Sequence, residues 1–231
     1  MKPGNADAGS YVRALSLFVA AQAGVVLLAG LNIAWSGTRA ALPMGEFVRW
    51  REMLSLSVFT PLSVVLQFLA VWTLERGRRD ATGPLTLFAL AACWLGVSMG
   101  VHEPILPFIR AAGPRLADSL WFWKEIFSHA MFFAAYTALS LALVWSQVRN
   151  PLPRPMSGTM AALFAVCGVV TGAGIYFSLL PAKDIRVDRW VMVVTLIAIM
   201  ALRRRRPLAL LPLNVVLEPA YVFALLALAA H

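Results

Sequence analysis

Residues 14–35 read ALSLFVAAQAGVVLLAGLNIAW, and this stretch decides the fold class. It carries no charged residue, and its polar residues are limited to Ser16, Gln22 and Asn32. A helix needs about 20 predominantly apolar residues to cross about 30 Å of hydrocarbon, and the stretch has that length. A second run of the same kind, MAALFAVCGVVTGAGIYFSLL, occupies residues 160–180. Both runs predict transmembrane helices.

The composition of the whole chain agrees with this interpretation. Of its 231 residues, 60% are hydrophobic and 13% are charged. Soluble domains usually contain about 25% charged residues. The sequence therefore predicts an all-α, polytopic integral membrane protein with about seven transmembrane helices, six being possible, and no soluble domain. The predicted spans are 13–35, 52–74, 84–108, 118–146, 157–180, 187–202 and 207–230.

The loops between these spans are short, so residues 1–231 are expected to form a single transmembrane domain. The first apolar run continues well past the small residues that imitate a cleavage site, which predicts a retained helix rather than a cleaved signal peptide. Gly96 with Gly100, and Gly168 with Gly172, have the G-x-x-x-G spacing that allows two helix backbones to approach closely. We interpret both pairs as helix-packing sites.

The net charge of +9 does not indicate nucleic-acid binding. The arginines occur in short groups between apolar spans, where they anchor and orient membrane helices, and no continuous basic face on a soluble domain is predicted. More Lys and Arg lie at the N-terminus and in the loops after spans two, four and six than in the opposite loops. This bias predicts a cytoplasmic N-terminus and an outside C-terminus. We expect the protein to lie in a bacterial inner (plasma) membrane, in contact with membrane lipid.

One polar stripe is predicted in the fourth span. Asp118, Glu125, His129 and Tyr136 are spaced by seven, four and seven residues, which places all four within about 40° of one another on a helix. Lys124 falls off this stripe, beside Trp121, and we interpret it as an interfacial anchor whose amine reaches toward water.

Two further segments carry polar residues at membrane depth. Span seven has Asn214, Glu218 and Tyr221 on one face, and span two has the weaker stripe of Thr60, Ser63 and Gln67. Ionisable residues in the hydrocarbon cost about 2.5–3.5 kcal/mol each on insertion scales, so they are functional candidates. Glu218 has a structural alternative, a protonated carboxyl group bonded to a neighbouring helix.

Span three ends with the sequence GVHEPILPFI, in which Pro104 is expected to bend or interrupt the helix. An antiparallel hairpin turning at residues 113–114 would bring His102 and Glu103 level with Glu125. Glu218 is expected at a similar depth from the other side of the membrane. The structural alternative for His102 is a cap on backbone groups freed by the proline. The residues predicted to converge in the outer half of the membrane are His102, Glu103, Glu125, His129 and Glu218.

This set predicts an intramembrane His/Glu site, with all five residues as metal ligands and with Glu125, His129 and Glu218 as catalytic residues. Mixed nitrogen and oxygen ligands suit a divalent metal such as zinc, iron or manganese. The leading functional prediction is a metal-dependent membrane enzyme for a lipid-soluble substrate: a lipid, quinone, isoprenoid or hydrocarbon. Two alternatives stay open. One is a proton-coupled transporter that uses the same groups as a relay, and the other is a non-catalytic subunit or assembly factor bound to other membrane subunits.

Overall fold

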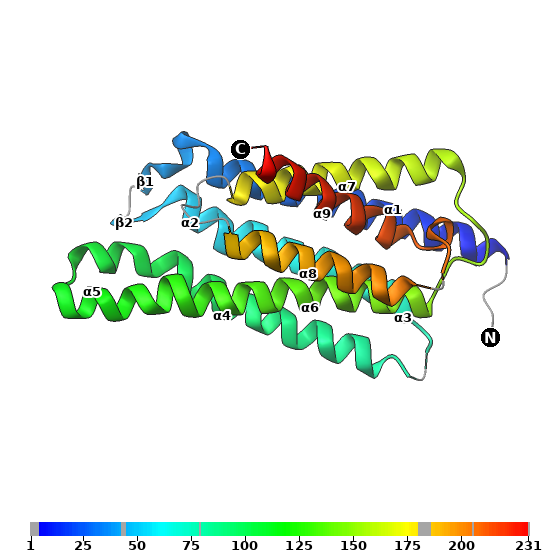
Figure 1. Cartoon of the computed structure of the whole chain (residues 1–231), viewed down its shortest axis with the longest axis horizontal. Coiled ribbons are helices and arrows are strands. Elements are labelled where there is room, and N and C mark those ends of the chain that lie inside the picture. The colour runs from blue at the N-terminus through cyan, green and yellow to red at the C-terminus, as the bar shows by residue number, and fades with distance from the viewer. Residues whose placement is uncertain (1–4, 43–44, 79, 180–185, 205, 231) are drawn as a thin grey trace.

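The computed structural model describes residues 5–42, 45–78, 80–179, 186–204 and 206–230. In this part of the chain, long helices run back and forth along one axis and pack side by side (Figure 1). The elements in chain order are α1 (Asn5–Ala34), a 3-10 turn η1 (Ser36–Arg39), β1 (Ala41–Leu42), β2 (Gly45–Arg49), α2 (Trp50–Leu54), a π-helix η2 (Ser55–Phe59), α3 (Thr60–Glu75), α4 (Thr82–Ala111), α5 (Pro114–Trp121), a π-helix η3 (Phe122–Phe127), α6 (Ser128–Arg149), α7 (Gly158–Leu179), α8 (Arg186–Arg203), a 3-10 turn η4 (Leu208–Leu210) and α9 (Pro212–Ala229).

Within the described residues, six helices are long and apolar enough to cross a membrane. They are Tyr11–Ala34, Trp50–Glu75, Thr82–His102, Pro114–Arg149, Gly158–Leu179 and Pro212–Ala229. The predicted span at 187–202 forms the helix α8, which packs against α6 and α9. Its 18 residues include Asp188, Arg189 and Arg203, so it is more polar than the other six. The predicted all-α membrane fold is confirmed.

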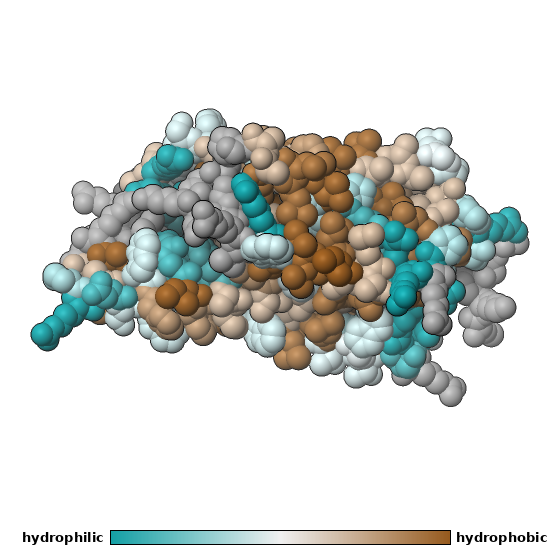
Figure 2. Space-filling model, viewed as in Figure 1, coloured by the Kyte–Doolittle hydropathy of each residue, from teal (hydrophilic) through white to brown (hydrophobic). Residues whose placement is uncertain are grey.

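The surface has the distribution that a lipid environment requires. Hydrophobic side chains form the middle of the visible face, and hydrophilic ones gather toward its two ends (Figure 2). Only 22–44% of each spanning window is buried inside the protein, so most of the apolar side chains face outward. Because hydrocarbon offers no hydrogen-bond partners, the backbone groups at this depth must be paired within helices. A short β1–β2 ribbon, which the sequence did not predict, lies at one end.

The turns between helices divide the molecule into two ends (Figure 1). The first turn of α1 and the α3–α4, α6–α7 and α8–α9 connections lie at one end, which we call the N-terminal end. The β1–β2 ribbon and the α4–α5 turn lie at the other, which we call the far end. The contacts α1–α3, α3–α6, α6–α9, α9–α7 and α7–α1 close a ring of five helices, with α4 packed outside α3 and α6.

Close helix packing in this ring depends on glycines of α7. A Cβ built on Gly168 would lie 2.5 Å from the Val216 carbonyl oxygen, and one on Gly172 would lie 2.5 Å from that of Ala220. These contacts confirm the predicted packing role of this pair. The prediction is wrong for Gly96 and Gly100, since a Cβ there meets nothing within 4 Å and both residues are exposed.

The fourth span is much longer than a membrane requires. Pro114–Arg149 forms 36 helical residues, or about 54 Å at 1.5 Å per residue, against about 30 Å of hydrocarbon. Its partner α4 continues through Pro104 to Ala111, so the helix is not interrupted at the proline. The predicted hairpin turn is confirmed, because α4 ends at Ala111 and α5 begins at Pro114. This hairpin extends farther than the neighbouring helices at the far end (Figure 1).

Candidate functional site

Three of the predicted site residues come together between α4 and the α5–α6 helix near the far end. The ring centres of His102 and His129 are 4.9 Å apart, with an angle of 38° between the ring planes. The Nδ1 atom of His129 lies 3.5 Å from Oε2 of Glu125. The antiparallel hairpin produces this meeting, because it sets residues on α4 level with residues the same number of positions beyond the turn. We call His102, Lys124, Glu125 and His129 the far-end cluster.

Lys124 belongs to this cluster, which corrects its interpretation as a separate interfacial anchor. The residue is only 8% exposed, and its amine pairs with Oε1 of Glu125. The same amine lies 5.5 Å from the centre of the Trp121 ring. A buried amine needs such partners because an unpaired charge away from water is costly. The cluster therefore contains one cation as well as the carboxylate and the two imidazoles.

The π-helix η3 explains why the sequence pattern misplaced Lys124 and Asp118. Residues 122–127 form i→i+5 hydrogen bonds, so this segment holds more residues per turn than the α-helix assumed in the prediction. Side chains before the π-helix are consequently rotated relative to those after it. Asp118, on the far side of η3, is exposed on α5 and contributes to no described contact with the cluster. Single π turns inside α-helices occur frequently at functional sites.

Hydrogen bonds around Ser128 fix the start of α6 against α4. The Ser128 hydroxyl donates to the Lys124 carbonyl oxygen, which the π-helical geometry leaves available. The Ser98 hydroxyl of α4 donates to the Ser128 carbonyl oxygen over 2.7 Å. Both serines are buried. These bonds set the rotation of α6 at the point where Glu125 and His129 project.

The structure does not bring Glu218 to this cluster. Its Oε1 and Oε2 atoms accept hydrogen bonds from Nε and Nη2 of Arg203 at 2.6 and 3.1 Å, and Oε1 also accepts one from Asn214 at 3.2 Å. Tyr221 bonds Ser140, which sets α9 against α6. Counting 1.5 Å per residue from that contact, Glu218 and His129 lie about 21 Å apart along the axis. The depth prediction failed for two reasons: α9 begins at Pro212 rather than at residue 207, and the fourth helix is 36 residues long and projects past its neighbours at the far end, which moves His129 away from the middle of the bundle.

No metal-ligand set is complete in the described part of the chain, where no three His, Cys, Asp or Glu side chains converge as they would around an ion. The side chain of Glu103 lies outside the described residues, so its predicted ligand role is untested. The separation of the two histidine rings is the one that a shared metal ion would need. An ion bonded to two imidazole nitrogens at about 2.0–2.1 Å holds the ring centres about 5 Å apart, and those of His102 and His129 are 4.9 Å apart.

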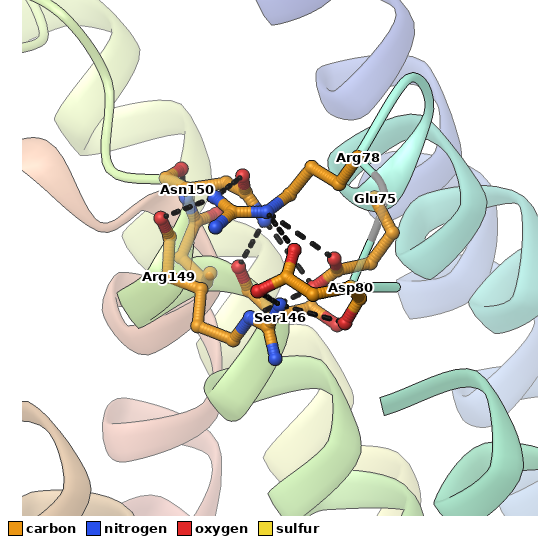
Figure 3. Close-up of polar contacts among 7 residues, drawn as sticks. Glu75, Arg78, Asp80, Ser146, Arg149 and Asn150 are labelled. Atoms are coloured by element: carbon orange, nitrogen blue, oxygen red, sulfur yellow. Dashed lines mark hydrogen bonds and ion pairs between the residues drawn. The ribbon is translucent and has the colours of Figure 1, made fainter. Parts of the chain in front are cut away.

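A second polar cluster, which the sequence did not predict, lies at the N-terminal end (Figure 3). It consists of Glu75, Arg78, Asp80, Arg149 and Asn150, and we call it the N-terminal network. Glu75 has no exposed side-chain surface, and its Oε1 atom lies 3.3 Å from the Asn150 amide and 3.8 Å from Nε of Arg149. No spacing pattern could reveal these contacts, because they join residues more than 60 positions apart.

Asp80 closes this network on its solvent side. Its carboxylate lies 3.1 Å from Nε of Arg78 and 2.6 Å from Nη2 of Arg149 (Figure 3). Hydrogen bonding to Arg78 holds the pKa of Asp80 below its ordinary value. Arg78 in turn has its pKa raised by the same bond. The network therefore ties the α3–α4 turn to the end of α6 through charge-assisted hydrogen bonds.

Comparisons with known proteins found no relative: no family model matches the chain, and no curated protein or solved structure matches it significantly.

Proposed function

We propose that this integral membrane protein is a metal-dependent enzyme whose site is the far-end cluster, with His102, His129 and Glu125 as the ligands. The observation that carries the proposal is the approach of the two imidazoles, 4.9 Å between ring centres, beside the Glu125 carboxylate. If these three side chains closed around a metal, they would leave a coordination position free for water or substrate, which is the arrangement of catalytic zinc sites. Zinc, iron and manganese all accept nitrogen and oxygen ligands of this kind.

The position of the cluster supports a lipid-soluble substrate. His102 lies about 30 Å along α4 from its first residue, Thr82, which equals the thickness of the hydrocarbon, so we place the cluster close to one edge of it. The His129 side chain is 42% exposed, so a molecule from the membrane can reach it. Trp121 and Trp123 are exposed one to two turns farther out, at the level where tryptophans favour the interface. A lipid head group or the polar end of a quinone or isoprenoid would meet the ligands there.

Metal binding is testable with the purified protein in detergent. Titration with Co²⁺, followed by visible absorption, should give one equivalent bound in the wild type. His102→Ala and His129→Ala should each weaken binding at least tenfold, and Asp118→Asn, which changes an exposed carboxylate outside the cluster, should leave it unchanged. If the wild type also bound less than one equivalent of metal, both in the Co²⁺ titration and by elemental analysis, the metal site would be contradicted.

Catalysis needs a separate readout, because a metal can be bound without turnover. Lipid extracts from membranes that contain the wild type should include at least one species that is depleted or formed relative to membranes with His129→Ala. Identical extracts, combined with normal metal binding, would show that the site does not act on membrane lipids.

One observation favours a second candidate, a subunit or assembly factor. The α4–α5 hairpin extends past the other helices, and it carries Phe108, Leu116, Trp121 and Phe122 at 47–59% exposure. Exposed aromatic residues are common at protein interfaces. Purification in mild detergent separates the candidates: a single species that retains metal supports the enzyme, and constant recovery with a second membrane protein supports the subunit.

A further inference from the structure

The polar side chains of the α5–α6 helix form a stripe that crosses the bundle. Glu125, His129, Tyr136, Ser140 and Gln147 follow one another at spacings of four, seven, four and seven residues, which keeps them near one face. They occupy three depths. The first two belong to the far-end cluster, Tyr136 and Ser140 lie in the middle, and Gln147 contacts the N-terminal network by donating to the Asn150 carbonyl oxygen over 2.9 Å.

The middle of this stripe borders a cavity inside the ring of five helices. Its volume is about 50 Å³, and residues from α1, α3, α6, α7 and α9 line it. Much of the lining is apolar, including Phe18, Leu66 and Val216. The hydrogen-bonding side chains in the lining come from four of these helices: Gln22, Gln67, Tyr136, Ser140 and Thr171. A packing defect in an apolar core would not collect polar groups in this way.

One polar atom of the cavity lining lacks a partner. The Gln22 amide nitrogen donates to the Ser63 hydroxyl over 2.7 Å, but the Gln22 Oε1 atom is buried and accepts no hydrogen bond within the described residues. Gln67 donates to the same Ser63 hydroxyl over 3.0 Å. Leaving a buried acceptor unpaired costs about 1–3 kcal/mol. The cavity must therefore supply a donor.

The size of the cavity selects water as that donor. A single water molecule needs about 10–15 Å³ of accessible volume, so 50 Å³ holds about three to five. A cavity that takes benzene is about 150 Å³, which excludes a ring or a lipid chain here. Buried waters typically make about three hydrogen bonds each, and Gln22, Gln67, Tyr136 and Ser140 provide donors and acceptors for them.

Buried polar atoms without a hydrogen-bond partner also occur at the N-terminal end of the ring. Tyr11 on α1 lies against Gln147 and Glu75. The Tyr11 hydroxyl lies near enough to Gln147 for a weak hydrogen bond, but this hydroxyl, Gln147 Oε1 and Glu75 Oε2 are all buried and form no well-aligned hydrogen bond with any described residue. Figure 3 shows the Glu75 carboxylate inside the N-terminal network. Water at this second place would satisfy two acceptors and a hydroxyl together.

We propose that the cavity bounded by Gln22, Gln67, Tyr136 and Ser140 holds a water cluster that passes protons along α6 between the N-terminal network and the far end of the bundle. In each step one water or hydroxyl accepts a proton on one side and releases another on the opposite side, so one proton enters and one leaves. The waters and hydroxyls then rotate back, which restores the starting orientation of the chain. The proposal is independent of metal binding.

Two apolar turns of α6 interrupt the polar stripe and should slow proton transfer along it. Leu143 separates Ser140 from Gln147 and is buried, and Phe132 stacks on Tyr136 with ring centres 5.9 Å apart on the way to His129. Water must enter these turns for each transfer, so the conductance should be low. A smaller or more polar residue at position 143 would hydrate the first turn.

The decisive experiment measures proton flux in liposomes that contain the full chain, with a potassium diffusion potential and a pH-sensitive dye inside. The wild type should conduct above protein-free liposomes, Tyr136→Phe and Gln22→Leu should lower the flux at least fivefold, and Leu143→Ser should raise it. Tyr176→Phe is the matched control, since Tyr176 lies on α7 outside the cavity lining and should change nothing. Wild-type flux equal to that of empty liposomes would overturn the proposal, as would unaltered flux in both cavity variants.

Hydroxyl-radical labelling provides a measurement that does not depend on flux. X-ray radiolysis modifies side chains next to bound water, so Tyr136 should be oxidised although it lies inside the bundle, and Gln22→Leu should reduce that oxidation. An unlabelled Tyr136 in folded protein would show a dry cavity and overturn the water cluster.

Discussion

Single residues of this protein take their roles from partners that are distant in the sequence. Glu218 and Glu125 are both carboxylates at membrane depth, but Glu218 is held by the Arg203 guanidinium through two hydrogen bonds, whereas Glu125 faces Lys124 and His129. Paired carboxylate and guanidinium groups form strong, directional contacts. Glu218 therefore joins α8 to α9, and the candidate chemistry stays with Glu125.

Because Glu218 joins two helices and lies away from the far-end cluster, its substitution should lower stability without affecting metal binding. Glu218→Gln removes the negative charge that Arg203 pairs with and replaces one acceptor oxygen by a donor, so it should destabilise the protein by about 1.5–3 kcal/mol, the range for hydrogen bonds to charged groups. Thermal unfolding in detergent, followed by tryptophan fluorescence, should show a lower midpoint. Metal binding measured below that midpoint should be unchanged. An unaltered midpoint together with lost metal binding would instead place Glu218 in the site.

At the scale of elements, α7 decides how closely the ring can pack. Its glycines face two neighbours, because Gly168 and Gly172 meet carbonyl groups of α9, while a Cβ on Gly174 would lie 2.4 Å from the Val26 carbonyl oxygen of α1. In a membrane, helix association depends on close van der Waals contact rather than on burial of apolar surface from water. Small residues on two faces therefore let α7 hold α1 and α9 together.

The variants Gly172→Ala and Gly96→Ala test whether close packing of α7 depends on its glycines. The first adds a methyl group 2.5 Å from the Ala220 carbonyl oxygen, and the second adds it to open space on α4. Overpacking typically costs about 1–3 kcal/mol, so Gly172→Ala should unfold at a lower temperature. Gly96→Ala should be neutral, or stabilising by up to about 1 kcal/mol through helix propensity. Equal midpoints for the two variants would contradict the close approach of α7 and α9.

At the scale of the whole molecule, polar groups collect at the two ends and apolar surface lies between them. The N-terminal network and the arginines of the α8–α9 connection mark one end, and the far-end cluster with its exposed tryptophans marks the other. Cytoplasmic loops of membrane proteins carry an excess of Lys and Arg. We therefore propose that the N-terminal end faces the cytoplasm, which places the far-end cluster on the outside.

Cysteine labelling tests this orientation. In a background of Cys93→Ala and Cys167→Ala, Ser157→Cys should react with a membrane-impermeant maleimide only when the cytoplasmic face is accessible. Ser36→Cys should react from the outside in intact cells. Both positions are exposed, one at each end. Reversed labelling would invert the orientation, and labelling of both positions from one side would contradict the bundle itself.

Much of the architecture follows from the sequence, because it depends on properties of single segments. Hydropathy and length predict where each helix lies, to within a few residues for most spans. A short turn at 112–113 forces α4 and α5 into an antiparallel hairpin, and this alone sets His102 level with Glu125. The candidate site was predictable to that extent: His102, Glu125 and His129 meet because they are close to one turn.

The remaining features depend on how each helix is rotated and how far it is shifted along its neighbours. The π-helix at residues 122–127 rotates Lys124 into the cluster, and the later start of α9 moves Glu218 away from it. The contacts of Glu75 with Arg149, and the cavity beside Gln22, require helices from distant parts of the chain to meet. Hydropathy along the chain is enough to select the segments that enter the membrane, because hydrophobic transfer acts on each segment separately. Which polar groups meet inside it follows from the folded arrangement, because pairing depends on packing between segments.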